Sequence, residues 1–206
     1  MPRGFPTVIH ALLARGHETA GRPYLVFDDG RGAPVAWTYG ETLAQAGRAA
    51  AALTARGVTR NDRVVIVGGN EPATVATLFG AMGAGALPAI VHSPLRADSK
   101  AAVAHLGAVI GRAEPKVVVA PTKMVAAVAA GPLAISAADL LADPGEPMAL
   151  VPPAPEAPSY LQFSSGSTGA QKAVIISAGA QAHNALATGR DVGLSEDETW
   201  VSWLPG

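Results

Sequence analysis

Apolar residues recur with a helical period in the first third of the chain. The segment TYGE at 38–41 has the spacing of a capping box and predicts that a helix begins there. Gly57 is a natural end for this helix, because glycine accepts the left-handed conformation that follows a helix terminus. The apolar stripe of the predicted helix consists of Leu43, Ala46, Ala50 and Leu53.

Short apolar runs, many of them β-branched, then alternate with further helical segments. The predicted strands cover 63–67, 87–91, 116–120 and 133–135, and a turn at Asn61-Asp62 precedes the first of them. The predicted helices cover 71–84, 98–112, 122–130 and 137–141, with Asn70 as the N-cap of the first. This alternation predicts an α/β fold with a mostly parallel sheet flanked by helices.

The uncharged stretch 72–91 is long enough to cross a bilayer as a single helix. Pro88 divides it, because proline blocks helix continuation and biases the preceding residue away from helix. We therefore expect a buried helix followed by a buried strand, and no membrane span.

Proline is concentrated in residues 143–159, DPGEPMALVPPAPEAPS, which excludes a helix or a central strand there. Beyond this connector, residues 160–163 and 173–176 can pair as two strands. We divide the chain into an α/β subdomain (1–142), the Pro-rich connector (143–159) and a third part (160–206). The third part holds the hairpin, a helix and the start of a further subdomain.

Charged residues make up 15% of the 206 residues, against about 25% in ordinary domains. The net charge of −1 gives no basic surface for nucleic acid or an anionic membrane. The low charge suggests that additional chain covers part of this surface. The absence of cysteine excludes disulfides, thiolate zinc sites and cysteine nucleophiles. The amino terminus lacks a long apolar run and a cleavage site, so we expect a cytoplasmic protein.

The loop between the two strands of the hairpin is SSGSTGAQK, residues 164–172. Small residues let backbone N–H groups approach a phosphate, hydroxyls add donors, and Lys172 adds a positive charge. A polar turn is the alternative, and the loop is not a Walker A motif, because Lys172 does not directly follow Gly169 and no hydroxyl residue follows it. The candidate phosphate-binding residues are Ser164, Ser165, Gly166, Ser167, Thr168, Gly169 and Lys172.

This loop resembles the signature [ST]-S-G-[ST]-T-G-x-P-K-G of the adenylate-forming superfamily, which includes acyl-CoA synthetases, luciferases and nonribosomal adenylation domains. Gln171 stands where that family usually has proline, and Ala173 stands where it usually has glycine. The segments at 37–53, 57–72 and 78–94 are also similar to the early helices and strands of the family. The resemblance implies the amino-terminal subdomain of the adenylate-forming fold.

Within the superfamily, the chain is most similar to fatty acyl-AMP ligases. The resemblance rests on HSPLR at 92–96, LQF at 161–163 and VSWLP at 201–205. It implies a ligase that converts a fatty acid and ATP to acyl-AMP and pyrophosphate and passes the acyl group to a carrier-protein thiol. It also implies Mg²⁺ as cofactor and a place in lipid metabolism or in polyketide or lipopeptide biosynthesis.

In that family, the adenine-binding motif, the magnesium ligand and the catalytic lysine lie downstream of the part that this chain resembles. We therefore assign no catalytic residue here and expect the chain alone not to catalyse at a meaningful rate. One alternative is a non-catalytic, truncated adenylation module that packs against other chain or binds a partner. Another is a synthetase that forms acyl-CoA or activates an amino acid.

The remaining candidate residues receive structural interpretations. The five histidines show no metal-ligand spacing, and we predict no metal site. The carboxylates at 28–29 and 196–198 lie beside turn residues, which favours solvated loops. Trp200 and Trp203 are spaced to lie near one another on a strand face, where core packing is expected and a wall of the acyl pocket is the alternative.

Overall fold

The computed structural model describes residues 4–30, 32–92, 100–128, 133–142, 145–163, 172–195, 198–199 and 201–202. The helices are α1 (Val8–Glu18), α2 (Tyr39–Ala55), α3 (Pro72–Gly83), α4 (Lys100–Ala113), α5 (Val125–Val128), α6 (Ala137–Leu141) and α7 (Ala178–Asp191), with a 3-10 turn at Thr122–Met124. The strands are β1 (Pro23–Phe27), β2 (Val35–Thr38), β3 (Arg63–Gly68), β4 (Leu87–His92), β5 (Val117–Ala120), β6 (Leu133–Ser136), β7 (Pro158–Phe163) and β8 (Ala173–Ser177).

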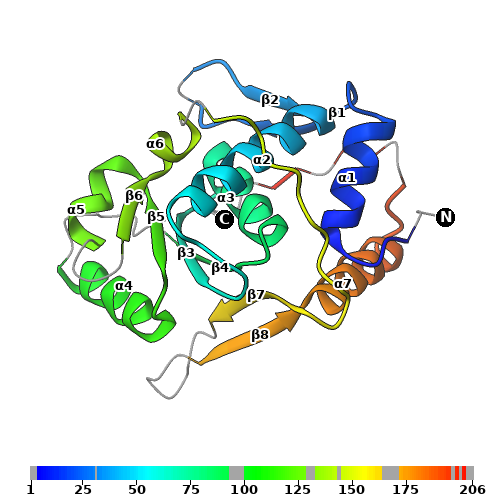
Figure 1. The fold of residues 1–206 in the computed structure, drawn as a ribbon. Coiled ribbons are helices and arrows are strands. Elements are labelled where there is room, and N and C mark those ends of the chain that lie inside the picture. The colour runs from blue at the N-terminus through cyan, green and yellow to red at the C-terminus, as the bar shows by residue number, and fades with distance from the viewer. Residues whose placement is uncertain are drawn as a thin grey trace.

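Four parallel strands form the central sheet in the order β4-β3-β5-β6, which confirms the predicted parallel α/β fold (Figure 1). The register pairs Ile66 of β3 with Ile90 of β4 and with Val119 of β5. Two antiparallel hairpins, β1–β2 and β7–β8, accompany this sheet. The strand β3 lies inside the sheet, and its residues from Val64 to Gly68 are all buried, as expected for a parallel strand that is covered on both faces.

The alternation of side chains along β3 divides the core into two layers. Val64 and Ile66 face the cluster that includes Leu53 of α2 and Leu140 of α6. Val65 and Val67 face the opposite cluster, to which α4, α5 and β7 contribute. The sheet is therefore covered by α2, α3 and α6 on one side and by α4, α5 and β7 on the other.

The helices α2 and α3 pack closely because small residues line their contact. A Cβ atom added at Gly80 of α3 would lie 2.7 Å from the carbonyl oxygen of Ala46 and 2.8 Å from the Cβ of Ala49, both on α2. Ala46, Ala50 and Leu53 are buried and Leu43 is partly buried, as the predicted apolar stripe requires. The predicted capping box of α2 is present between Thr38 and Glu41.

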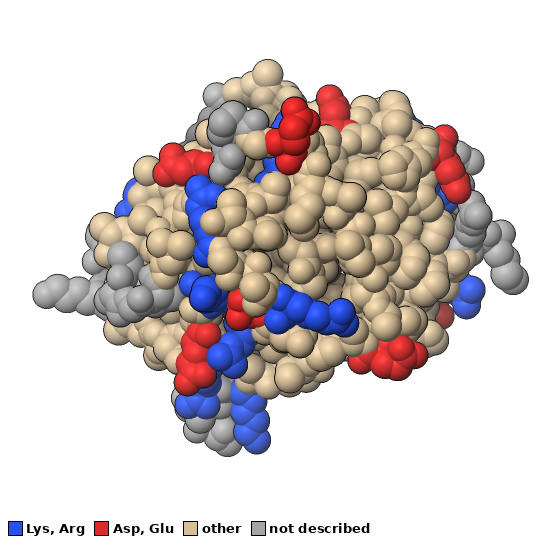
Figure 2. Space-filling view, viewed as in Figure 1, with Lys and Arg blue, Asp and Glu red and all other residues tan. Residues whose placement is uncertain are grey.

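The uncharged stretch 72–91 folds as the buried helix α3 followed by the strand β4, as predicted. Among the described residues, no helix has both the length and the apolar character that a membrane crossing requires. Figure 2 shows a broad face of the molecule on which few charged side chains lie, in line with the low charge of the composition.

The structure corrects two local predictions. The N-cap of α3 is Glu71 and not Asn70, because Pro72 occupies the first helical turn and fixes the helix start one residue later. The strand β7 begins at Pro158, so the last two residues of the predicted connector belong to a strand. Proline is compatible with the first position of a strand, where its missing N–H costs no ladder bond.

The first forty residues contain elements that the sequence patterns did not predict. The helix α1 begins at the N-cap Thr7, and its buried residues Ile9 and Leu12 join a cluster with α2 and α3. The hairpin β1–β2 is held to α2 by stacking of the Tyr24 and Tyr39 rings, whose centroids are 4.3 Å apart. These elements cover the α2–α3 side of the core.

Candidate functional site

The predicted phosphate loop lies between β7 and β8, which pair as antiparallel strands. Phe163, the last residue of β7, pairs with Ala173, the first residue of β8. Lys172 immediately precedes β8, and its side chain is exposed. The other candidate phosphate-binding residues, Ser164, Ser165, Gly166, Ser167, Thr168 and Gly169, lie outside the described residues, as does Gln171.

The strand β7 is anchored to the central sheet on the side of β4. Leu161 is buried in the cluster that contains Leu87 and Ala89 of β4, and Phe163 packs partly against the same cluster. Tyr160, which precedes Leu161, packs partly against a second cluster, which includes Ala46 and Met82. Burial raises the pKa of Tyr160, because the charged phenolate would lose its hydration. The hairpin therefore shares the apolar core of the sheet.

The direction of β7 determines where its last residue, Phe163, lies relative to the sheet. Pro158, the first residue of β7, lies in one groove with Asn61 and Gly85, which precede β3 and β4. Leu161, further along β7, packs beside β4. The strand thus starts at the amino end of the parallel strands and runs toward their carboxyl ends. The carboxyl edge of a parallel sheet is the usual side for ligand binding in α/β folds.

The strand β8 leads directly into α7, and this junction is tied to the connector. The hydroxyl oxygen of Ser177 caps α7 by accepting a hydrogen bond from the N–H of Ala180. The N–H groups of Ala178 and Gly179 donate to carbonyl oxygens of Ala157 and Pro155, at 3.0 and 2.8 Å. The connector therefore holds the far end of the hairpin as well as its beginning.

The other sequence-based candidates that the structure describes do not gather into a second site. The described residues contain no group of three His, Asp or Glu side chains that could hold a metal ion. The hydroxyl of Thr7 and the ring Nδ1 of His10 lie 2.8 Å apart at the start of α1, and Asp28 accepts a hydrogen bond from the N–H of Gly30 in a turn. Glu196, Asp197, Trp200 and Trp203 lie outside the described residues.

Two features near the hairpin were not found from the sequence. The packing of Tyr160 against the cluster that includes Ala46 and Met82 joins segments that are far apart in the chain, and no local pattern marks it. The groove beside Pro158, into which Arg60 extends, is formed by three separate segments. The positive charge of Arg60, beside the turn at Asn61, is the one feature of the sequence that could have indicated this groove.

Residues 12–206 match the protein family described as AMP-binding enzyme. Among solved structures, the chain is similar to the fatty acyl-adenylate ligases from E. coli and L. pneumophila, with a TM-score of 0.83, 24% identity, and coverage of 98% of this chain and 37% of that chain. It is similar to the adenylation domain of a keto acid-selecting NRPS module bound to keto acyl adenylate, with a TM-score of 0.86, 18% identity, and coverage of 98% and 37%.

The chain is also similar to VinN in complex with 3-methylaspartate, with a TM-score of 0.77, 26% identity, and coverage of 93% of this chain and 53% of that chain. No curated protein matches the chain. The chain spans about a third to a half of the length of these solved structures. These similarities identify the fold as the amino-terminal subdomain of adenylate-forming enzymes.

Proposed function

Because the chain belongs to the family of AMP-binding enzymes, we propose that it is the amino-terminal part of an ATP-dependent ligase that joins a carboxylic acid to AMP. The observation that carries this proposal is that the sequence SSGSTGAQK connects β7 to β8. The segment joins the paired ends of β7 and β8, and β7 runs toward the carboxyl edge of the parallel sheet.

In the proposed reaction, a carboxylate oxygen of the acid attacks the α-phosphorus of ATP. The bond from the α-phosphorus to the oxygen that bridges it to the β-phosphate breaks, and pyrophosphate leaves with the electron pair. The role of the loop is to bind the β- and γ-phosphates through its backbone N–H groups, its hydroxyls and Lys172. Holding these phosphates fixed orients the leaving group and offsets its negative charge, and both effects favour the transfer.

The proposed phosphate-binding residues are Ser164, Ser165, Gly166, Ser167, Thr168, Gly169 and Lys172. Mg²⁺ accompanies ATP in this proposal, since it neutralises phosphate oxygens in such sites. The described residues offer no cluster of carboxylates or histidines for the ion. We therefore assign no residue of this chain to Mg²⁺ and no step to the metal.

The proposed substrate is a fatty acid, and the proposed acceptor of the acyl group is the thiol of an acyl carrier protein in the cytoplasm. Support comes from the similarity to the fatty acyl-adenylate ligases and from the segments at 92–96, 161–163 and 201–205. These assignments would place the protein in lipid metabolism or in polyketide or lipopeptide biosynthesis. Transfer to coenzyme A is the alternative for the acceptor.

Activation of an amino acid is a second candidate for the substrate. It is favoured by the similarity to VinN, which has 26% identity and was solved with 3-methylaspartate. A non-catalytic module is a third candidate, favoured by Gln171 and Ala173, which replace the proline and glycine typical of the loop. The three candidates differ in whether the protein exchanges pyrophosphate into ATP and in the class of acid that supports this exchange.

Acid-dependent exchange of labelled pyrophosphate into ATP tests the proposal in the protein that carries this chain. We expect exchange with fatty acids and a loss of about a hundredfold in Lys172→Ala, the size of effect seen when one charge-stabilising donor is removed from an active site. Lys123→Ala is the matched control, because Lys123 is an exposed lysine on the 3-10 turn after β5.

Each outcome of the exchange assay selects one candidate. Exchange with amino acids alone would replace the fatty-acid assignment, and absence of exchange with either class of acid would favour the non-catalytic module. Full activity of Lys172→Ala would overturn the role given to the loop. Acyl transfer to a carrier protein, compared with transfer to coenzyme A, separates the two acceptors.

A further inference from the structure

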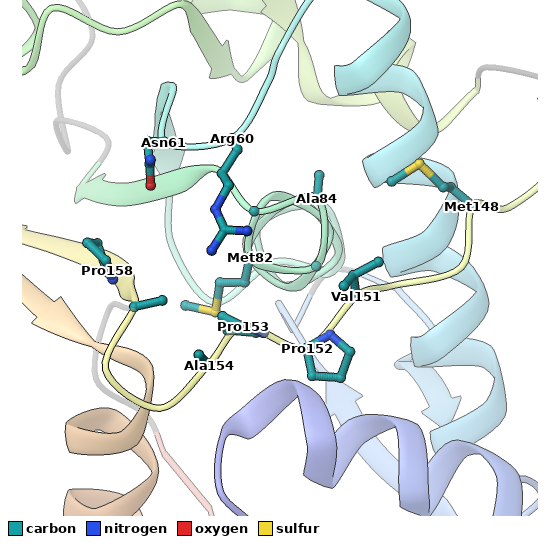
Figure 3. Close-up of a pocket in the computed structure, with 13 residues that line it drawn as sticks. Arg60, Asn61, Met82, Ala84, Met148, Val151, Pro152, Pro153, Ala154 and Pro158 are labelled. Atoms are coloured by element: carbon teal, nitrogen blue, oxygen red, sulfur yellow. The ribbon is translucent and has the colours of Figure 1, made fainter.

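A groove of about 420 Å³ lies at the amino end of the parallel sheet (Figure 3). One wall comes from Arg60 and Asn61, in the turn before β3, and from residues 82–85, which end α3 and lead to β4. The other wall comes from the Pro-rich connector. The side chains that the connector contributes are apolar, and they include Met148, Val151, Pro152 and Pro153.

This groove is separate from the loop that we propose for ATP. Pro158 lies in the groove, whereas Phe163 is the last residue before the loop. Five steps along an extended strand span about 17 Å. The groove is at the amino end of the strands, and the loop is at the end of β7 that runs toward their carboxyl ends. A ligand in the groove would therefore not overlap with the phosphates of ATP.

Arg60 gives the groove a positive charge that nothing in its lining offsets. Figure 3 shows the side chain of Arg60 extending from the turn toward the groove, which Met82 also lines. In the described part of the chain, Arg60 forms no ion pair or hydrogen bond, and no acidic residue lines the groove. A Cβ atom at Gly85 would lie 3.5 Å from the Cγ of Arg60, so the stem of the side chain rests against Gly85.

The nearest carboxylate in sequence is already engaged elsewhere. Asp62 accepts two hydrogen bonds of 2.8 Å from Thr59, one from its N–H and one from its hydroxyl. The charges of Lys116 and Arg63 add to this stabilisation and lower the pKa of Asp62 further. Asp62 thus turns toward Thr59 and the neighbouring cations, which leaves the guanidinium of Arg60 available to an external anion.

We propose that this groove binds a small organic acid, whose carboxylate pairs with the guanidinium of Arg60 and whose apolar body lies against the connector. A planar guanidinium matches the geometry of a carboxylate, which can accept two parallel hydrogen bonds from it. The volume lies within the usual range for sites that hold small molecules. Because an exposed ion pair alone is weak, the apolar contacts with Met82, Val151 and Pro152 must contribute to binding.

The chemistry of the groove predicts which compounds bind. A carboxylate with one aromatic ring or a short acyl chain fits both the charge and the apolar wall. Acetate lacks the apolar body, and an uncharged amide of the same shape lacks the partner for Arg60.

Backbone amide NMR of the ¹⁵N-labelled chain, titrated with 3-phenylpropionate, tests the proposal. We expect saturable shifts at the amides of Gly83, Gly85, Ala154 and Ala157, which line the groove. Affinity for 3-phenylpropionamide should be about tenfold lower, since the charge-assisted hydrogen bonds are lost. The absence of saturable shifts at these amides, or equal affinity for the amide, would overturn the proposal.

Four variants locate the binding. Arg60→Met keeps the apolar stem and should weaken binding about tenfold, whereas Arg112→Met, at an exposed arginine of α4, is the matched control and should not change it. Val151 is 67% exposed, so its substitution spares the core. Val151→Glu should abolish binding, and Val151→Lys should strengthen it. Unchanged affinity in Arg60→Met would contradict the assignment.

Two further measurements distinguish the groove from the ligase site and from a surface that binds a protein. Lys172→Ala and added ATP should leave the titration unchanged, and exchange activity should not differ between Arg60→Met and the parent protein. Competition between ATP and 3-phenylpropionate would show that 3-phenylpropionate binds at the ligase site, and it would overturn the proposal. Shifts that occur with an acidic peptide and not with 3-phenylpropionate would overturn it in favour of a protein partner.

Discussion

Phe163 and Ala173 face each other across the β7–β8 hairpin, so the two ends of the loop at 164–172 start from adjacent strands. Adjacent strands lie about 4.8 Å apart, which fixes both ends of the loop relative to the sheet. The position of the hairpin depends on how β7 is anchored, with Leu161 in the cluster of Leu87 and Ala89 and Tyr160 packed partly against the cluster that includes Met82.

The anchoring of the hairpin can be tested on one cross-strand pair. Leu161 and Ile175 are partners in the register, but Leu161 is 5% exposed and Ile175 is 62% exposed. Leu161→Ala should reduce the free energy of unfolding by about 2–5 kcal/mol, since it leaves a cavity in the core. Ile175→Ala should cost less than about 1 kcal/mol. Urea unfolding measures both, and equal losses would contradict the described packing.

Substitution of glycine by alanine should have opposite effects on stability at Gly80, in the contact of α2 and α3, and at Gly111, on α4. Gly80→Ala should destabilise the protein by about 1–3 kcal/mol, because its Cβ would lie 2.7 Å from the carbonyl oxygen of Ala46. Gly111 lies in α4 with no atom within 4 Å of an added Cβ. Gly111→Ala should therefore stabilise the helix by about 0.5–1 kcal/mol. Thermal unfolding of both variants checks the sign, and destabilisation by Gly111→Ala would contradict the open surroundings of that residue.

Stability at alkaline pH should depend on Tyr160. Burial raises its pKa above the unfolded value of about 10. A raised pKa in the folded state contributes stability below the unfolded pKa, and this contribution is lost as the pH rises through the folded pKa.

We therefore expect the free energy of unfolding to fall above pH 10, and to fall less steeply in Tyr160→Phe. Tyr24, whose pKa is also raised by burial, leaves a residual slope in that variant. Urea unfolding across this range provides the measurement. An unchanged slope in Tyr160→Phe would show that burial of this phenol does not govern stability at alkaline pH.

Stability at acid pH should depend on Glu41 and Asp62. The backbone N–H of Thr38 donates to Glu41 at 2.7 Å, and hydrogen bonds with Thr38 lower the pKa of Glu41 below 4.5. Hydrogen bonds from Thr59 lower the pKa of Asp62 below 3.8. A lowered pKa contributes stability above the unfolded pKa, and the contribution is lost as the pH falls through the folded pKa.

The double variant Glu41→Gln, Asp62→Asn should therefore have a flatter stability profile below about pH 4.5 than the parent protein. Urea midpoints measured between neutral and acid pH test this expectation. A parallel profile in the double variant would mean that other carboxylates govern acid stability. Thr38→Ala, which removes the capping hydroxyl, should cost about 1 kcal/mol at neutral pH.

The sequence by itself determined most of the elements of the parallel sheet. The helix from Tyr39, the strand from Arg63 and the strand from Leu87 were predicted at or near their observed bounds. Each of these depends on interactions within a few residues, such as the Thr38–Glu41 capping box and the left-handed conformation of Gly57. The prediction of Asn70 as an N-cap was wrong, because Pro72 in the first turn makes Glu71 the N-cap of α3.

Tertiary structure alone decided how these elements meet. The strand order β4-β3-β5-β6, the placement of β7 beside β4 and the groove at Arg60 all join residues that are distant in the chain. Periodicity reports which face of an element is apolar but not which other element covers it, because that choice depends on the fit of many side chains at once. The sequence thus predicted a phosphate loop on a hairpin, and the packing of Leu161 and Tyr160 against two different clusters decided where that hairpin lies.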